Sequence, residues 1–328
     1  MQALAMRAHA AVVAGLLISF ALPLAAGAQT WPNRTITAII PLAAGNAIDI
    51  AGRIVLDQVS KQVGQPIVVE NRVGAGGTIG ANAAAKAAPD GYTLLVHSST
   101  IAITHSLYNN LPYDTVKDFQ PVIAFGVSPS VLVVAPSKGF KTVNDLVAAA
   151  KAKPGELNFA SAGHGSASHL AAERLIHSAG IKAQHVPFRG PNEAIAELMG
   201  GRVDFYFLPL APALPYVRSG QLTALAVSTS KRAAALPDVP TTTEAGLRDS
   251  TYEFWVGLFV PAKTPHDIVA RLYQETSKAL QNPEVRERLA KTGMEPMPMT
   301  NAQFDAHFKT EIASIAKLVR EAGIKPAN

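Results

Sequence analysis

Two short loops of small residues carry the pattern that points most directly to chemistry. Residues 41–49, Pro-Leu-Ala-Ala-Gly-Asn-Ala-Ile-Asp, follow the apolar run 36–40 and lead into a helix-like segment. Residues 161–166, Ser-Ala-Gly-His-Gly-Ser, follow the strand-like run 158–160 and also precede a helix-like segment. Backbone N–H groups at a strand-to-helix turn bind an anion without any charged side chain. The two loops therefore predict a carboxylate clamp, with Ala43, Ala44, Gly45, Asn46, Ala47, Ser161, Ala162, Gly163, His164, Gly165 and Ser166 as its contacts.

Two other segments extend this candidate site. Ser98, Ser99 and Thr100 follow an apolar strand-like run, where their hydroxyls suit either donation to a carboxylate or the capping of a helix. Arg189 has the geometry to pair bidentately with a carboxylate, although a solvated arginine is the alternative. The predicted third wall of the site consists of Phe188, Arg189, Gly190 and Asn192.

For several residues near these loops, we predict a structural role rather than contact with a ligand. Asp49 falls in the first turn of a predicted helix, where a carboxylate complements the helix dipole. His169 is predicted to brace the second loop through its ring nitrogens. Asp204 is predicted to tie a strand to a loop, and Phe254 and Trp255 are predicted to fill the core rather than line a cleft.

Motifs of common enzyme classes fail on inspection. The glycine-rich run 74–80 has Ile79 where the third glycine of a dinucleotide fingerprint belongs. Ser161, His164 and His169 invite a hydrolase interpretation, but the chain has neither a Gly-x-Ser-x-Gly elbow nor a carboxylate clearly placed to orient a histidine. There is no Walker A motif, no HExxH and no cysteine. We therefore predict a binding protein without catalytic residues, cofactor or metal.

The first 28 residues predict export. Arg7 gives a basic start, residues 11–24 are almost wholly apolar, and Ala26-Gly27-Ala28 is a small-x-small cleavage signal. A membrane anchor is the alternative, but the apolar run is shorter than the roughly 20 residues that a spanning helix needs. We predict a periplasmic protein whose signal peptide is cleaved near Ala28.

The composition of the chain is that of a globular protein. Hydrophobic residues make up 48% and charged residues 16% of 328 residues, with a formal net charge of +5. No dense Lys/Arg cluster interleaved with aromatic residues occurs, so nucleic acid is not a predicted partner. Without cysteine, the fold must rely on burial rather than on disulfides.

Short apolar runs alternate with helical patterns along the chain, which predicts an α/β fold with mostly parallel sheets. Predicted strands are 36–40, 66–69, 92–96, 131–135, 158–160, 184–186, 203–207, 222–227 and 255–259. Predicted helices are 48–63, 78–87, 143–152, 168–178, 192–199, 265–280, 283–291 and 302–321. Composition shifts near residues 121–136 and 237–250 predict a domain formed by 29–130 and 254–328 with a second domain, 131–253, inserted into it.

The sequence resembles the Bug or TctC family, the periplasmic solute receptors of tripartite tricarboxylate transporters, along nearly its whole mature length. The matching stretches are 31–37, 41–49, 64–72, 74–77, 88–95, 111–114, 117–119, 160–163, 169–171, 185–190, 200–204, 233–244 and 283–288. The resemblance implies a two-lobed type II periplasmic binding fold with a ligand pocket between the lobes. It also implies a small, usually carboxylated ligand and a membrane permease with one large and one small subunit.

Departures from the family pattern bear on the ligand. The first loop has Leu-Ala-Ala-Gly-Asn at 42–46 where the family usually has Phe-Pro-Ala-Gly-Gly, and the second has His164 in place of a common asparagine. Leu208-Pro209 stands where many members have an acidic residue, which argues against an amino acid as ligand. We predict a plain mono- or dicarboxylate, with an apolar or aromatic body left open.

The predicted mechanism is a hinged clamp formed by a monomeric receptor. Residues 43–47 and 162–166 would hold one carboxylate from opposite lobes, and residues 98–100 and 188–192 would contact the rest of the ligand. Closure is favoured only when the ligand touches both lobes. A receptor that serves sensing rather than uptake remains the alternative, and a secreted hydrolase is the weaker one.

Overall fold

The computed structural model describes residues 31–108 and 110–324. The predicted signal peptide and its cleavage position lie outside the described residues. The chain divides into two units, 1–33 and 34–328, and both sheets belong to the second unit. None of the described helices combines the length and the apolar composition that a membrane-spanning helix requires.

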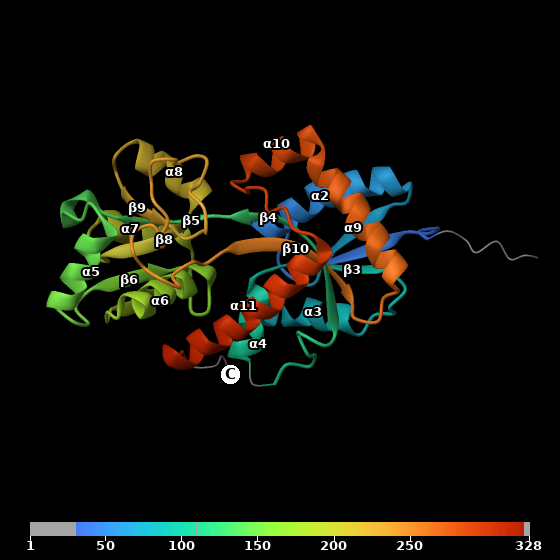
Figure 1. Ribbon diagram of the computed structural model, residues 1–328, viewed down its shortest axis with the longest axis horizontal. Helices are drawn as coiled ribbons and strands as arrows, with labels where there is room; N and C mark the ends of the chain where they lie inside the picture. The colour runs from blue at the N-terminus through green and yellow to red at the C-terminus, as the bar shows by residue number, and fades with distance from the viewer. Residues whose placement is uncertain (1–30, 109, 325–328) are drawn as a thin grey trace, which may run out of the picture. The chain divides into compact units, whose positions relative to one another are not determined.

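The first sheet has the strand order β2-β1-β3-β10-β4. Strand β1 pairs in parallel with β2 and β3, whereas β10 pairs antiparallel with β3 and β4. Helices lie on both faces of this sheet (Figure 1). The strands are β1 (Ile36–Ile40), β2 (Ile67–Asn71), β3 (Thr93–Ser98), β4 (Phe119–Ser128) and β10 (Phe254–Pro261), and the helices are α2 (Ala47–Val63), α3 (Thr78–Ala85), α4 (Thr100–Leu107), α9 (His266–Gln281), α10 (Pro283–Lys291) and α11 (Asn301–Glu321).

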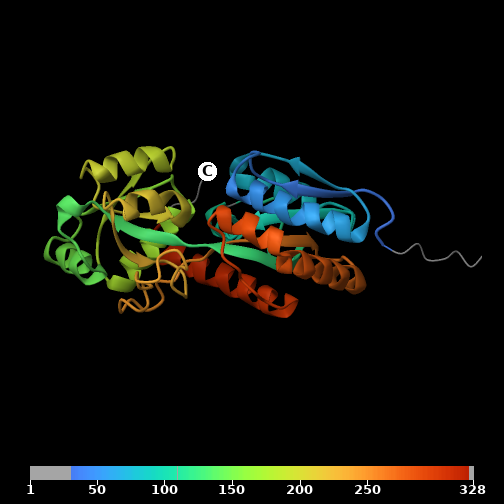
Figure 2. The ribbon, with the colours of Figure 1, turned by 90° about the horizontal axis from the view of Figure 1, so that it is seen from above.

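The second sheet has the order β7-β6-β8-β5-β9 and repeats the same mixture of pairings. Strand β6 pairs in parallel with β7 and β8, whereas β5 pairs antiparallel with β8 and β9. Figure 2 shows helices on both sides of this sheet as well. Its elements are β5 (Ser130–Val134), α5 (Val143–Ala152), β6 (Asn158–Ser161), α6 (Ala167–Ala179), β7 (Gln184–Pro187), α7 (Pro191–Met199), β8 (Phe205–Pro209), α8 (Leu210–Arg218) and β9 (Thr223–Val227).

The chain passes between the sheets twice. Strands β4 and β5 are separated only by Pro129, so one extended stretch leaves the first sheet and enters the second. The return runs from β9 through residues 228–253 to β10. The strands next to the two crossings, β4, β5, β9 and β10, pair antiparallel with their neighbours. Each sheet therefore contains both parallel and antiparallel pairs. The α/β class is confirmed, but the sheets are not mostly parallel as the sequence predicted.

Alternating residues of the strands supply the cores. On β5 and β8, Leu132 and Phe207 belong to a cluster that includes α5 and α6, while Val133 and Tyr206 belong to another with α7 and α8. This is the period of two that buries both faces of a strand. In the first sheet, a Cβ on Gly52 of α2 would come within 2.8 Å of the terminal methyl of Ile40, so α2 packs closely on β1 at this glycine.

Helix starts match the local sequence signals. Thr142 and Asp145 form a complete capping box at α5, and Thr300 and Gln303 form another at α11. Asn282 caps α10 just before Pro283. These predicted caps are confirmed because each needs only residues within three positions of one another.

Three elements were missed by the sequence patterns. Strand β4 contains Pro121, which suggested a domain boundary but is tolerated because β4 is an edge strand. Helix α8 contains Pro212 and Pro215, which obscured its helical pattern. Helix α4 has only eight residues, and four of them are Thr, Ser or His.

Candidate functional site

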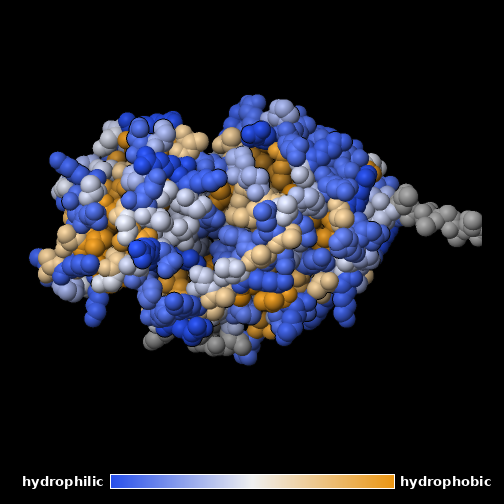
Figure 3. Space-filling view, in the orientation of Figure 1, coloured by the Kyte–Doolittle hydropathy of each residue, from blue (hydrophilic) through white to orange (hydrophobic). Residues whose placement is uncertain are grey.

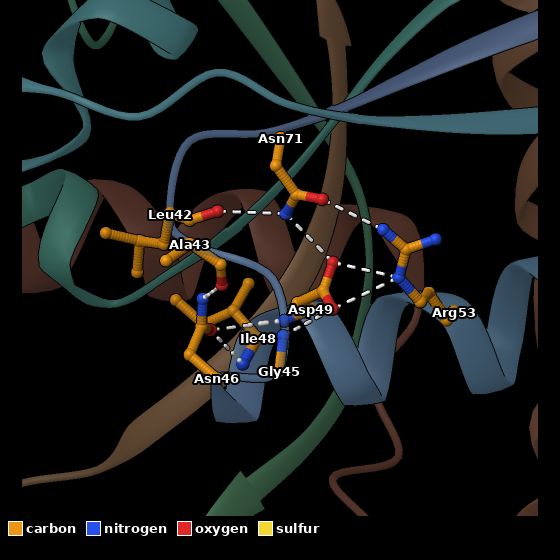
Figure 4. A network of polar contacts seen from close by, with 8 residues as sticks. All are labelled: Leu42, Ala43, Gly45, Asn46, Ile48, Asp49, Arg53 and Asn71. Atoms are coloured by element: carbon orange, nitrogen blue, oxygen red, sulfur yellow. Dashed lines mark hydrogen bonds and ion pairs between the residues drawn. The ribbon is translucent and has the colours of Figure 1, made fainter.

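The first predicted loop joins β1 to α2 and is capped by its own side chain. Asn46 accepts hydrogen bonds at Oδ1 from the N–H groups of Ile48 at 2.8 Å and Asp49 at 3.2 Å. Its amide nitrogen donates back to the carbonyl of Ala43. Figure 4 shows these contacts at the helix start. Asn46 therefore takes the place at the N-terminus of α2 that an external anion would otherwise occupy.

Asp49 is the centre of a buried network behind this loop. Its carboxylate accepts from the N–H of Gly45 at 2.9 Å, from Arg53 Nε at 3.0 Å and from Asn71 Nδ2 at 2.9 Å. Asn71 also donates to the carbonyl of Leu42 at 2.9 Å, so one amide ties both ends of the network together (Figure 4). Burial by itself would raise the pKa of Asp49, but the hydrogen bonds from Arg53, Gly45 and Asn71 outweigh it and lower the pKa.

This network decides which donors of the first loop face outward. The N–H of Gly45 is used by Asp49, and those of Ile48 and Asp49 are used by Asn46. Within the described part of the chain, the N–H groups of Ala43, Ala44 and Ala47 have no hydrogen-bond acceptor, and all three residues are exposed. Of the predicted donors in this loop, these three remain available to a ligand.

We expect Asp49→Asn to loosen this loop. An amide cannot accept from all three donors, so buried donors lose a partner at a cost of about 1–3 kcal/mol in the free energy of unfolding. Because the folded-state pKa of Asp49 is depressed, its stabilisation is present above the unfolded pKa and is lost as the pH falls through the folded pKa. Urea unfolding at neutral and acidic pH measures both effects.

The matched control is Asp57→Asn on the same helix. Asp57 is an exposed partner of Lys61, and such surface changes stay within about 0.5 kcal/mol. Equal effects of the two substitutions would contradict the role of Asp49 as the centre of the network.

The second predicted loop, between β6 and α6, is also held by its own side chains. The N–H of Ala162 donates to Ser168 Oγ at 3.0 Å, and the N–H of Gly163 donates to Ser161 Oγ at 3.1 Å. Ser166 caps α6 by accepting from the N–H of His169 at 3.3 Å. Ser161 is fully buried, so its hydroxyl serves the loop rather than its outer surface.

Three histidines gather around this loop. His169 and His185 stack with ring centroids 3.9 Å apart, and His164 lies 5.1 Å from His169. Phe159 continues the stack at 4.9 Å from His185. Burial, reinforced by the neighbouring imidazoles, lowers the pKa of His185 to about 4 and also lowers the pKa of His164. The lowered pKa of His164 disfavours its charged form, so this loop histidine is a poor source of positive charge for an anion at neutral pH.

The predicted hydroxyl segment lies at the junction of β3 and α4. Ser98 Oγ lies 2.8 Å from Thr100 Oγ1 and accepts from the N–H of Thr100 at 3.3 Å, whereas the N-cap residue of α4, Ser99, makes no side-chain capping bond. Ser98 and Ser99 are fully buried, while Thr100 is half-buried. A Cβ added to Gly165 would come within 2.7 Å of Leu107 in α4, so the second loop lies against an element of the first sheet.

The third predicted wall lies between β7 and α7. Phe188 is half-buried, and its N–H donates to the carbonyl of Ser161 at 2.9 Å, which joins this wall to the second loop. Arg189 and Asn192 are exposed, and Gly190 precedes α7. Among the described residues, no carboxylate lies within ion-pair distance of the Arg189 guanidinium.

Asp204 lies where it can tie a strand to a loop. Its carboxylate accepts from the N–H of Asn158 at 2.7 Å and pairs with Lys138 Nζ at 2.6 Å. Trp255 is fully buried among aromatic side chains of α11, and Phe254 is half-buried. Trp255 therefore lies in the core, whereas Phe254 is only partly covered.

Two cavities lie away from the predicted loops. One of about 810 Å³ is lined by β4, α9, α10 and residues 294–300, including Met294, Met297 and Met299. Figure 3 shows an apolar hollow beside α10. The other, of about 180 Å³, lies among Arg174, Tyr252 and Glu311 near the return crossing. Neither contains a predicted site residue, so size alone does not identify the ligand loops.

Sequence patterns missed two histidines next to the loops. His97 is fully buried at the end of β3, where its Nδ1 accepts from the N–H of Ser98 at 2.8 Å and desolvation lowers its pKa to about 4. His185 was predicted only as part of a strand. Its long separation in sequence from the second loop gives no local signal of their contact.

Two mixed sheets covered by helices, with loops at strand-to-helix junctions, define the class of two-lobed periplasmic binding proteins. Solved structures of this class align with most of the chain. Rpa4515 of R. palustris with adipate has 32% identity and a TM-score of 0.74, and the alignment covers 90% of this chain and 100% of that one. MatC from Rhodopseudomonas palustris with bound malate has 34% identity, a TM-score of 0.70 and coverages of 88% and 100%.

The chain belongs to the TctC family, the tripartite tricarboxylate transporter family receptors, whose model matches residues 51–324. BugT of Bordetella pertussis is 37% identical over 300 residues, which are 91% of this chain and 92% of that protein. The resemblance inferred from the sequence is thereby confirmed. The chain is a member of a family of periplasmic solute-binding receptors and not an enzyme.

Proposed function

We propose that this receptor binds a small mono- or dicarboxylate between the first loop, residues 43–47, and the second loop, residues 161–166. One observation carries the proposal. The first loop connects a strand of the first sheet to a helix, and the second loop connects a strand of the second sheet to a helix. The outward N–H groups of Ala44 and Ala47 suit one carboxylate. The bound adipate and malate of two relatives support an acidic ligand.

Arg189 is the proposed contact for the ligand's negative charge. It is exposed next to the second loop, and a guanidinium binds a carboxylate through two parallel hydrogen bonds. Thr100 and Asn192 are proposed to contact the distal part of the ligand. The buried Ser98, Ser99 and Ser161 are proposed to support these contacts from behind, because their hydroxyls face inward.

The proposed mechanism is closure of two lobes, 29–130 with 254–328 and 131–253, around the ligand. Only contacts made with both lobes in the closed state favour closure. The closed monomer would then dock on a permease with one large and one small membrane subunit. We further propose that the chain reaches the periplasm after cleavage near Ala28.

The test is a binding screen on the purified protein, stripped of carried-over ligand by unfolding and refolding. We expect one acid among adipate, malate, benzoate and related compounds to raise the melting temperature and to be recovered chemically intact. The diamide of the same compound should give no shift, since it lacks the negative charge. If no acid changed the melting temperature and an amide raised it, the carboxylate proposal would be overturned.

Arg189→Ala localises the site. Loss of a charged hydrogen bond of about 1.5–3 kcal/mol predicts roughly 10- to 100-fold weaker carboxylate binding by calorimetry. Arg218→Ala is the matched control, since Arg218 is an exposed arginine at the end of α8. Equal affinities of the two variants would remove Arg189 from the site.

A further inference from the structure

Three histidines from three separate parts of the chain converge beside the second loop. His164 lies in the loop, His169 in the first turns of α6 and His185 in β7. One ring nitrogen from each lies within 4.8 Å of the others. Such convergence of imidazoles is the basic requirement of a transition-metal site.

The hydrogen bonds of His169 determine which of its nitrogens carries the proton. Nδ1 accepts from the N–H of Gly165 at 3.1 Å, so Nδ1 has the lone pair. Nε2 then carries the hydrogen and faces Glu173 Oε1 at 3.5 Å. A carboxylate on the far nitrogen is the usual outer partner of a metal-binding histidine, because it fixes the tautomer and the ring orientation.

His185 has the same tautomer by a separate argument. The single hydroxyl proton of Ser161 is donated to the carbonyl of Gly163 at 3.0 Å. Ser161 Oγ must therefore accept from His185 Nε2, which lies 2.6 Å away. The lone pair of His185 is left on Nδ1, the atom through which this tautomer can bind a metal ion.

We propose that His164, His169 and His185 form a binding site for one Zn²⁺ ion, and that Ni²⁺ and Cu²⁺ can substitute for it. Imidazole nitrogens suit these ions, whereas Mg²⁺ and Ca²⁺ prefer oxygen ligands. Three protein nitrogens leave a coordination position open for water. Its ligands differ from the proposed carboxylate contacts Ala44, Ala47 and Arg189, but His164 lies in the second loop, which the proposed carboxylate site shares.

Binding requires a defined rearrangement. A metal ion lies in the plane of each ligating ring, whereas His169 and His185 are stacked with planes only 11° apart. One ring must therefore rotate away from the stack, and the Gly165 N–H must leave His169 Nδ1. Gly163 and Gly165, with φ of +121° and +72°, flank His164 in the segment that has to move. This rearrangement lowers the apparent affinity by the fraction of competent conformers.

The test is calorimetric titration of the full-length exported protein with ZnCl₂, without a polyhistidine tag and in the absence of any carboxylate. We expect one ion per chain. We also expect at least about tenfold weaker binding in His164→Ala, since loss of even an outer partner costs about 10- to 100-fold. His164 is exposed, so its removal leaves the core intact. MgCl₂ should give no binding heat.

His266→Ala is the matched control, because His266 is an exposed histidine at the start of α9. It should bind Zn²⁺ like the parent protein. Nitrogen NMR of the imidazoles gives a second readout: the signals of His164, His169 and His185 should shift together at one equivalent. No stoichiometric binding, or binding that depends on His266 rather than His164, would overturn the site. Carboxylate binding measured separately would be unaffected by that outcome.

Discussion

Trp255→Ala is expected to destabilise the protein by about 3–5 kcal/mol, the usual cost of removing a large buried aromatic side chain. Trp255 has no exposed surface. Its ring packs against Phe304 at 5.2 Å and Phe308 at 6.1 Å, both edge-on and both from α11, and lies 6.0 Å from Phe259. The substitution removes the side chain through which β10 holds α11 against the first sheet. Urea unfolding followed by circular dichroism measures the change.

Trp255 also has a polar function that aggravates its loss. Its indole Nε1–H donates to Glu311 Oε2 at 2.5 Å, and Glu311 is buried. The alanine variant would leave this carboxyl without that donor in addition to creating a cavity. Trp255→Phe keeps most of the volume and should fall between the parent protein and the alanine variant.

Met199→Ala is the control for Trp255→Ala. Met199 ends α7 with 41% of its surface exposed, so its truncation should change stability by no more than about 0.5 kcal/mol. A Trp255→Ala protein as stable as Met199→Ala would show that the α11 packing does not hold in solution.

Glu311→Gln is expected to flatten the dependence of stability on pH. Desolvation by burial raises the pKa of Glu311 to about 8, despite the donor from Trp255. Arg174 opposes the rise, Glu253 adds to it, and His307 Nε2 lies 3.8 Å away. All of these groups except Trp255 line the cavity of about 180 Å³ near the return crossing.

Proton binding to Glu311 determines whether the stability of the protein rises or falls with pH. Between about pH 4.5 and pH 8 the folded protein keeps the Glu311 proton while the unfolded chain has released it. The folded state then binds more protons, so its stability falls as the pH rises through this window and levels off above it. A shift from 4.5 to about 8 corresponds to at most about 5 kcal/mol, which the permanently neutral glutamine avoids.

The measurement is urea unfolding of both proteins at pH 5 and pH 8. The stability of Glu311→Gln relative to the parent protein should increase from pH 5 to pH 8. Asp305→Asn removes a half-buried acid that pairs with Lys309 on the same helix, and this variant should follow the parent protein at both values. An identical pH dependence for the parent protein and Glu311→Gln would show that Glu311 does not titrate in this window.

Local interactions explain which parts of the fold were predictable. Thr142, Asn282 and Thr300 cap helices by binding residues two or three positions away, so these helix starts are visible in the sequence. Elements that depend on their position in a sheet were not visible. Pro121 is tolerated in β4 because β4 is the last strand of the first sheet in the described part of the chain.

The sequence by itself determined the family, the α/β class and the two loops at strand ends, because each of them depends on patterns among neighbouring residues. The tertiary structure decided how those loops are used. Asn71 and Arg53 reach Asp49 from another strand and another turn, and this contact directs the Gly45 N–H inward. His185 likewise joins His164 and His169 only because β7 pairs with β6. Contacts between residues far apart in the chain arise from sheet pairing and burial, which no local pattern records.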